Sequence, residues 1–426
     1  MKVTALWVYP IKGLRGIPLE TADLGPQGLR HDRVFTVCRV DGDGDDAQLR
    51  HMQLSRFPQC SLFHQDMTDD GSHIRVRYQQ PRLDPPPSSS SSPPSTSGSP
   101  AAARPPAHRP EHDQTLHVPL EPDTTRLERA VVNIHQSVVS AYRVGKRYDD
   151  WFSACFGFPV ALLYIGDQRR PVLGSMAPSN PSAADRHAAA SNSSSGGGGG
   201  GGGWLSSIVT SLVGGDKTGA TGAGGAKEPE WLRFSDCAPY LVTTEASLAD
   251  VSARMARGQQ DVDMVKFRPN IVVDGDSPFD EDYWAELSVR GRPALSMSKM
   301  CGRCTSLNVD YDAGRPALGE QGTLLKKLMP DRRVDPGAAY TPVFGRYAFL
   351  SDQLASDTLL LRRSEGETPG SDAGDGDAAG DLRISVGDSV AVTRRNDARP
   401  VWDWPLKDPS SARFYSYSHP PTAQTA

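Results

Sequence analysis

Alternation of apolar and polar residues predicts strands along most of the first part of the chain. The runs VTALWVY from Val3, DRVFTVCRV from Asp32 and HIRVRYQ from His73 have the two-residue period of a half-buried strand. TLHVPL and AVVNIHQSVVSAYRV continue the pattern, and PVALLYIG is an apolar run typical of a buried strand. One helix interrupts them at YDDWFSACFG, where we expect Asp149 or Asp150 to cap the N-terminus.

The later part of the chain also reads mainly as strands. The first half of EWLRFSDCAPYLVTTEASLADVSARMARG predicts a strand, and from Thr244 a cap, helical periodicity and a terminating Gly258 predict a helix. GTLLKKLMP predicts a helical turn, and VFGRYAFL and ISVGDSVAVTRR predict two closing strands. We therefore expect a mainly β protein with some α (α+β), arranged as closed or nearly closed barrels.

Low-complexity segments divide the ordered sequence. Residues 84–114 are rich in Pro and Ser, residues 176–227 in Ser and Gly with an unbroken glycine run at 196–203, and residues 365–381 form an acidic loop. Such compositions predict disorder, and WLSSIVTSLVGG within the second segment predicts only a transient helix. The expected organisation is an N-terminal β-barrel domain at 1–165, a second β-barrel domain at 228–396 and a tail at 397–426.

Charge and cysteine usage narrow the class of protein. A net charge of −5 over 426 residues gives no general basic surface, so nonspecific nucleic-acid binding is not expected. Six cysteines spread over this length do not resemble a secreted disulfide framework. No apolar run approaches the roughly 20 residues that span a bilayer, and MKVTALWVYP reads as a strand. We expect a cytoplasmic protein, or a mitochondrial association if the natural chain begins further upstream.

The stretch CGRCTSLNVD holds the first candidate chemistry, because Cys301 and Cys304 form a loop that we expect to run directly into a strand. Zinc is disfavoured, since there is no second cysteine pair and no histidine between His187 and His419. A redox dithiol is weakened because a helix start, not a strand, would lower the thiol pKa. A thiolate ligand to a softer metal and two cysteines packed as small apolar groups both stay open.

Basic residues beside turn-forming residues accompany this loop. Lys12 precedes Gly13, Arg268 lies close to Asn270, and Arg33 and Arg303 lie in similar short segments. Each alone is most often a solvated surface charge. Together with a thiolate, they are what a large anionic cofactor carrying a metal requires, because guanidinium groups hold phosphates while sulfur holds the metal.

These segments resemble a known family. LWVYPIKGLRGIPLETADLGPQGLRHDRVFTV resembles the N-terminal β-barrel extension of MOSC proteins. FSDCAPYLVTTEASLADV, FRPNIVVDGDSPFDEDYWAEL, CGRCTSLNVDYDAG and PVFGRYAFL with ISVGDSVAV resemble, in that order, the MOSC domain of the mitochondrial amidoxime-reducing components and their bacterial relatives.

The resemblance implies a molybdenum cofactor (Mo-molybdopterin) between the two domains, with the metal bound by Cys304. It places cofactor contacts at Lys12, Gly13, Arg33, Cys237, Ala238, Arg268, Asn270, Gly302 and Arg303. Family members commonly carry hydroxyl residues at the positions of Cys237 and Ala238, so this chain departs from the pattern there. Asp236 keeps its place and is expected to be a catalytic proton source or an anchor, and Cys301 becomes a neighbour of the ligand.

The resemblance also implies a reaction, which is reduction of amidoximes and hydroxylamines by two-electron removal of oxygen. No cysteine follows Cys304 and no glycine fingerprint for nicotinamide or flavin occurs, so we expect electrons from an external chain. The expected donor is a cytochrome b-type protein with its NADH-dependent reductase, or a ferredoxin-type chain. The alternative is a non-catalytic molybdenum cofactor or sulfur carrier related to the sulfurase C-terminal domain, without that enzyme's pyridoxal-phosphate domain. A third reading is a cofactor-free interaction protein.

Overall fold

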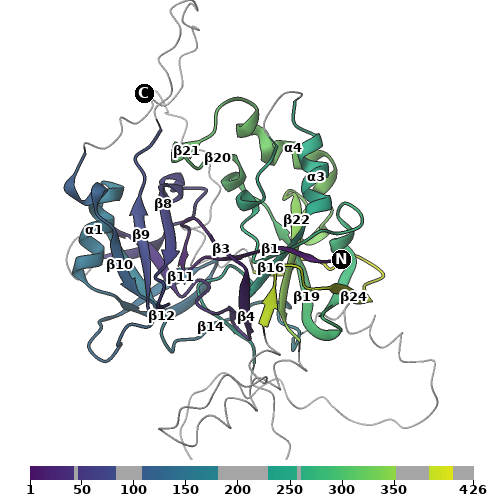
Figure 1. Cartoon of the computed structure of the whole chain (residues 1–426), viewed down its shortest axis with the longest axis horizontal. Helices are drawn as coiled ribbons and strands as arrows, with labels where there is room; N and C mark the ends of the chain where they lie inside the picture. The colour runs from purple at the N-terminus through teal and green to yellow at the C-terminus, as the bar shows by residue number, and fades with distance from the viewer. Residues whose placement is uncertain (43–46, 83–107, 181–228, 257–260, 352–382, 406–426) are drawn as a thin grey trace, which may run out of the picture.

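The structure, a computed structural model, describes residues 1–42, 47–82, 108–180, 229–256, 261–351 and 383–405. Strands dominate these ranges and helices are few, which confirms the mainly β, α+β architecture. Figure 1 shows two halves side by side, the N-terminal one in purple and blue and the C-terminal one in green. No helix in the described ranges is long and apolar enough to cross a membrane.

A six-stranded sheet forms the base of the N-terminal half. Its order is β11 (Arg129–Ile134), β12 (Ser137–Arg143), β13 (Val160–Tyr164), β6 (Phe35–Asp41) and β2 (Ile11–Lys12), with β7 (Gln48–His51) paired to β6. β6 and β13 are the apolar runs expected from the sequence, and Phe35, Val37 and Leu162 bury their side chains in the core. AVVNIHQSVVSAYRV forms the β11–β12 hairpin.

A three-stranded sheet and one helix close this core. The strands are β8 (Phe63–Met67), β9 (His73–Tyr78) and β10 (Leu116–Pro119), and the helix is α1 (Lys146–Phe156). The expected cap was wrong, because α1 begins after Gly145 and Asp149 lies in its first turn. Asp149 instead accepts hydrogen bonds from Leu162 N and Arg143 Nε, both at 2.8 Å, which tie the helix to β13 and β12.

An eight-stranded sheet forms the C-terminal half. Its order is β24 (Val390–Arg395), β18 (Trp284–Val289), β19 (Arg292–Gly302), β22 (Val343–Leu350), β16 (Tyr240–Thr244), β17 (Ile271–Val273), β1 (Val3–Val8) and β3 (Ile17–Leu19). All residues of β22 are buried, as its central position requires. ISVGDSVAVTRR is not one strand: it breaks at Gly387, where φ is +92°, into β23 (Arg383–Ser385) and β24.

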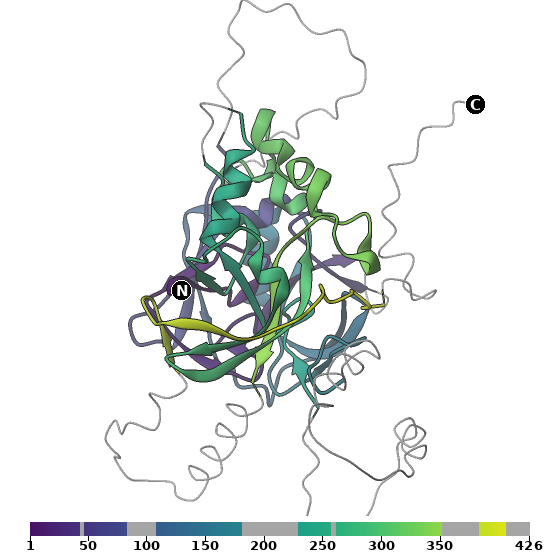
Figure 2. The ribbon, with the colours of Figure 1, turned by 90° about the vertical axis from the view of Figure 1, so that its right-hand side faces the viewer.

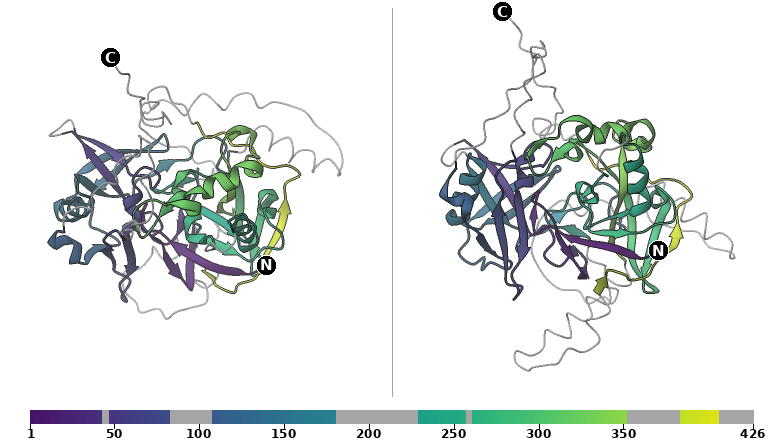
Figure 3. Two further views of the ribbon diagram at one scale, coloured as in Figure 1. Left: turned by 90° about the horizontal axis from the view of Figure 1, so that it is seen from above. Right: turned by 45° about the horizontal axis from the view of Figure 1, so that its top comes forward.

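Strands from the start of the chain join the two halves. β1 pairs with β17, so the N-terminus lies in the C-terminal half (Figure 1). β4 (Thr21–Gly25) pairs with β5 (Gly28–Leu29) and with β23, while β14 (Arg170–Pro171) pairs with β15 (Trp231–Leu232). The view from above in Figure 3 shows the same two halves meeting along the segments that follow β1. The segment between β1 and β3 therefore lies where the two halves meet.

Two helices, α3 (Glu245–Ala253) and α4 (Leu324–Arg332), lie together beside the large sheet (Figure 2). The expected cap of α3 is confirmed, because the Thr244 side chain accepts from Ser247 N. The helix ends at Ala253, and Gly258 lies outside the described residues. The remaining short elements are η2 (Pro58–Leu62), η3 (Pro110–Asp113), η4 (Met264–Phe267), η5 (Asp280–Tyr283), η6 (Thr305–Asn308), β20 (Val309–Asp310), β21 (Arg315–Pro316), η7 (Gly319–Thr323) and η8 (Pro336–Ala338).

The borders of the low-complexity segments need correction. Residues 110–113 form η3, whose His112 ring packs 4.7 Å from that of Tyr78, so order resumes before residue 114. Met176 is 1% exposed within an apolar cluster, so order also continues past residue 176. The start of the tail packs on the barrel, with Trp404 buried. The glycine run, WLSSIVTSLVGG and residues 365–381 lie outside the described residues.

A buried carboxyl beside α3 makes stability depend on pH. Glu281 is fully buried, and burial raises its pKa from 4.5 to about 7 although Ser247 Oγ donates to it at 2.8 Å. Because the folded-state pKa is the higher one, the unfolded state binds fewer protons and stability falls as pH rises between these values. We expect Glu281→Gln to be neutral near pH 4 and stabilising by up to about 3 kcal/mol near pH 8 in urea unfolding. Equal effects at both pH values would contradict this.

Candidate functional site

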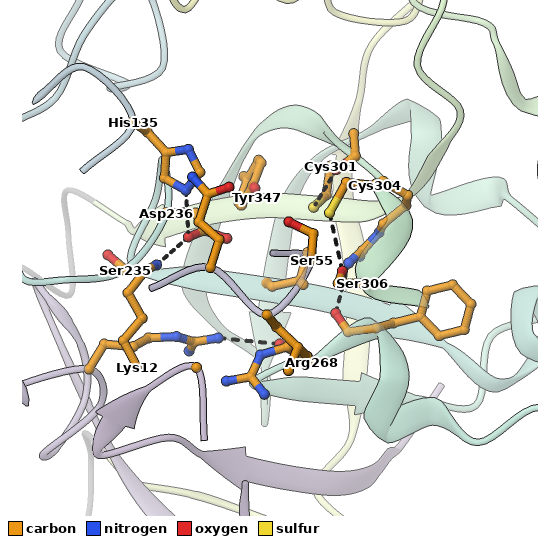
Figure 4. A pocket seen from close by; sticks show the side chains of 18 of the residues that line it. Lys12, Ser55, His135, Ser235, Asp236, Arg268, Cys301, Cys304, Ser306 and Tyr347 are labelled. Carbon is orange, nitrogen blue, oxygen red and sulfur yellow. Dashed lines mark hydrogen bonds and ion pairs between the residues drawn. The ribbon is translucent and has the colours of Figure 1, made fainter. Parts of the chain in front are cut away.

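A cavity opens where the loop after β1 meets the end of β19. It contains about 900 Å³ of unfilled space, part of it open to solvent. Figure 4 shows Lys12, His135 and Asp236 on one side and Cys301, Cys304 and Ser306 on the other. Both halves of the molecule thus contribute to its walls.

The structure brings nearly all the residues expected from the sequence to this cavity. Its lining includes Lys12, Gly13, Arg33, Asp236, Ala238, Arg268, Asn270, Gly302, Arg303 and Cys304. Cys237 does not line the cavity: it is 4% exposed and packs in an apolar cluster with Cys301 and Tyr347, which do line it. Ser235, which the sequence did not single out, lines the cavity, and its buried Oγ has no hydrogen-bond partner among the described residues.

The cysteine loop differs from its expected conformation. β19 ends at Gly302, and Cys304 precedes the 3-10 helix η6, so no strand follows the second cysteine directly. Cys304 is partly exposed, with Sγ 3.2 Å from Ser306 Oγ. Cys301 is buried, and burial raises the pKa of its thiol. Cys304 is therefore the cysteine of this loop that is accessible to a ligand.

Arg303 holds this loop in place. Its Nε and Nη2 donate to Phe344 O at 3.0 and 2.6 Å, and its Nη1 donates to Phe267 O at 2.8 Å. These bonds attach the loop to β22 and η4. The contact with a cofactor phosphate, which the resemblance implies for Arg303, stays a prediction.

Two guanidinium groups flank one aromatic ring at the floor of the cavity. Arg33 and Arg268 place their Cζ atoms 4.5 and 4.4 Å from the centre of the Tyr9 ring. Arg33 also donates to Asp32 Oδ2 at 2.5 Å and to Asn270 Oδ1 at 3.0 Å, so Asn270 fixes the arginine. Both arginines have positive φ, 48° and 55°, a costly conformation outside glycine that is often retained at functional sites.

The opposite side of the cavity carries acid–base groups. Asp236 Oδ1 accepts from Lys12 Nζ in an ion pair and lies 2.9 Å from His135 Nε2. Its position inside the cavity opposes ionisation, but Lys12 and His135 hold its pKa well below the usual range. Burial lowers the pKa of Lys12, although Asp236 opposes that shift. The carboxylate is thus ionised near neutral pH, beside an ammonium group that releases its proton more readily than an ordinary lysine.

Several groups at or behind this wall were not found from the sequence. His51, His135 and Lys266 line the cavity, and Arg170 is fully buried behind it. Arg170 donates to the carbonyls of Arg233, Ile134, Ser235 and Asp236. His135 could have been noticed as one of two residues between the halves of AVVNIHQSVVSAYRV, the place of a hairpin turn. The positions of His51 and Arg170 had no local signal.

The donor set fits an anionic cofactor that carries a thiol-binding metal. Cys304 offers one accessible sulfur, and a single thiol suits a metal whose other ligands come from the cofactor. Arg33 and Arg268 supply cations for phosphate or ring carbonyl groups, and the unpartnered Ser235 Oγ offers a further polar contact. Within the described ranges, no group of three or more His, Cys, Asp or Glu residues is placed to hold a metal ion.

The fold and this cavity define a mainly β protein in which arginines and one accessible thiol line a cavity between two halves. The profile of the MOSC domain matches residues 229–391, and that of the MOSC N-terminal β-barrel domain matches residues 1–92. The chain therefore belongs to the MOSC-domain proteins that carry the N-terminal β-barrel domain. The expected domain borders at 165 and 228 stay predictions.

Curated relatives agree with this family. The chain is 35% identical over 125 residues to human mitochondrial amidoxime-reducing component 1, covering 28% of this chain and 35% of the relative. It is 38% identical over 120 residues to bovine mitochondrial amidoxime-reducing component 2, covering 27% and 34%. A rice molybdenum cofactor sulfurase is 33% identical over 90 residues, which are 20% of this chain and 11% of the relative. The chain spans about a third of the length of the amidoxime-reducing components it matches.

Proposed function

We propose that this protein is a molybdenum-cofactor-dependent oxidoreductase that reduces N-hydroxylated compounds such as amidoximes and hydroxylamines. The observation that carries the proposal is the arrangement of one cavity: the accessible thiol of Cys304 lies across from the Asp236–Lys12 pair, with Arg33 and Arg268 at its floor. Similarity to the amidoxime-reducing components supplies the reaction class.

Each side chain has a role in this proposal. Cys304 would bind the metal, and Arg33 and Arg268 would hold the anionic part of the cofactor. The bound cofactor would supply two electrons and accept the substrate oxygen. Asp236 is ionised in the resting site, so it orients the proton donors and is not the resting source of the proton. Lys12 Nζ holds a proton at the cavity, available for the oxygen that leaves as water.

The electron donor and the location complete the proposal. Two electrons per turnover would come from a cytochrome b-type protein with its NADH-dependent reductase, or from a ferredoxin-type chain. A cytoplasmic location stays a prediction, and the names of the animal relatives instead say that those proteins are mitochondrial.

Neutralising Asp236 tests its role in the reaction. We expect Asp236→Asn to lower turnover of an aromatic amidoxime by about 10²- to 10⁴-fold, because an uncharged amide cannot form the ion pair that holds the Lys12 ammonium group at the cavity. Molybdenum and pterin content per chain should stay at the parent level. Asp312→Asn is the matched control, since Asp312 is similarly exposed and pairs with Arg15 away from the cavity. Loss of metal in Asp236→Asn would instead mark a structural anchor.

A non-catalytic carrier of cofactor or sulfur is the rival proposal, and the similarity to a molybdenum cofactor sulfurase favours it. Multiple turnovers separate the two. Loaded protein, excess amidoxime and reduced methyl viologen as donor should give many amidine molecules per chain for an enzyme. Release of cofactor or sulfur to an acceptor protein without amidine formation would support the carrier.

A further inference from the structure

The tip of the β11–β12 hairpin has a backbone conformation that its residues disfavour. Ile134 pairs with Ser137, so His135 and Gln136 form a two-residue turn, and their φ values are +51° and +68°. Two positive φ values define a turn that strongly prefers Asn–Gly, because a Cβ atom is strained in this region. Residues that keep such strain are often retained for function.

Contacts from other parts of the fold hold the turn in this conformation. Trp404 Nε1, from the start of the tail, donates to His135 O at 2.7 Å. Arg170 donates to Ile134 O at 3.4 Å and to Asp236 O at 2.7 Å, so one buried guanidinium fixes both the turn and the acidic residue it faces. The imidazole of His135 consequently points into the cavity, with Nε2 2.9 Å from Asp236 Oδ1.

The surroundings of His135 suit proton transfer from solvent. Its side chain is 30% exposed, whereas Lys12 is 9% exposed and His51 is buried. The His51 and His135 rings lie 6.4 Å apart. The titratable and charged groups that face His135 are Lys12, His51 and Asp236, with Arg170 behind them. His135 and Asp236, whose side chain is 49% exposed, form the solvent-accessible edge of this cluster, and the Lys12 ammonium group is its buried end.

We propose that His135 is a proton-relay residue that acts through Asp236 and resupplies Lys12 after each turnover. This inference rests on the proposed reductase function. In that reaction a hydroxylamine, two electrons from the external donor and two protons give an amine and water: the N–O bond breaks, one proton joins the leaving hydroxyl to form water, and the other joins the nitrogen. Each turnover consumes protons in the cavity, and the relay brings them from solvent to Lys12 Nζ by way of the Asp236 carboxylate.

Two substitutions in the same turn test the relay. Asn suits the positive φ of residue 135, so His135→Asn should raise the melting temperature of the cofactor-free protein by about 2 °C or more. It should nevertheless lower turnover by at least about 10-fold, with a steeper fall as pH rises, because bulk water then supplies the protons. Gln136→Gly, the matched control outside the cavity, should stabilise similarly and keep the parent's turnover and pH profile.

The outcomes separate this inference from the function on which it rests. If His135→Asn keeps the turnover and the pH profile of the parent protein, the relay is overturned and the reductase function stands. Parallel loss of pterin and turnover would mean that His135 only supports the cavity, which also overturns the relay. A parent that is loaded with cofactor but forms no amine with reduced methyl viologen would overturn the proposed function and the relay together. Restoration of turnover by added imidazole in His135→Ala is the further result expected.

Discussion

Replacing Cys304 by alanine is expected to lower the rate of amidoxime reduction by more than about 100-fold. Mutation of residues that only hydrogen-bond to a metal ligand already lowers metal affinity or activity by about 10- to 100-fold, and loss of the ligand itself should cost more. The reason is chemical: Cys304 has the accessible thiol of this loop, and alanine offers the metal no donor. Molybdenum content should fall, while pterin should be largely retained because Arg33 and Arg268 are unchanged. Metal analysis, pterin fluorescence and steady-state rates measure the three quantities.

Cys301→Ala is the matched control for that experiment. Cys301 lies in the same loop but packs in the apolar cluster with Cys237 and Tyr347, and burial raises the pKa of its thiol. It should cost a modest loss of stability, about 1 kcal/mol, and keep the metal. Equal loss of metal in both variants, or full activity in Cys304→Ala, would contradict the assignment of the ligand.

Replacing Arg170 by leucine is expected to destabilise the protein by about 3–5 kcal/mol. Arg170 is fully buried and donates to four backbone carbonyls from two segments of the fold. Leucine would leave those acceptors buried without their donor. The hairpin turn and the Asp236 segment would lose their common support, so turnover should also fall in the protein that still folds. Urea unfolding and steady-state rates test both effects.

The neighbouring Arg169 provides the control. It is exposed and stacks over the Trp231 ring at 5.2 Å, so Arg169→Leu should change stability by less than about 1 kcal/mol. A loss below about 1 kcal/mol in Arg170→Leu would show that the four carbonyls find other partners and that this arginine does not organise the site.

Local sequence patterns predicted the strands whose apolar and polar side chains alternate and the helix whose N-terminus is capped by a side chain. β1, β6, β13 and β22 follow from their apolar periodicity, and the Thr244 side chain caps α3 as its sequence indicates. The prediction that Asp149 or Asp150 caps α1 was wrong, because Asp149 forms hydrogen bonds with β12 and β13. Tertiary contacts thus overrode the local preference.

The candidate site was predictable only where a motif marks it. The loop of Cys304 and the segments of Lys12, Arg33 and Arg268 were recognisable as family motifs, and the cavity unites them. His135 and Arg170 belong to no such motif. Their positions depend on a hairpin turn and on four carbonyl groups from distant segments, which exist only in the folded chain.

Molybdenum and pterin content per chain, measured after expression in a host that makes the cofactor, tests the central claim most directly. The two arginines of the cavity and the accessible Cys304 thiol predict close to one pterin and one molybdenum per chain in the parent protein. Protein that folds with the expected stability but contains neither pterin nor molybdenum would contradict the cofactor site, and with it the proposed reductase function.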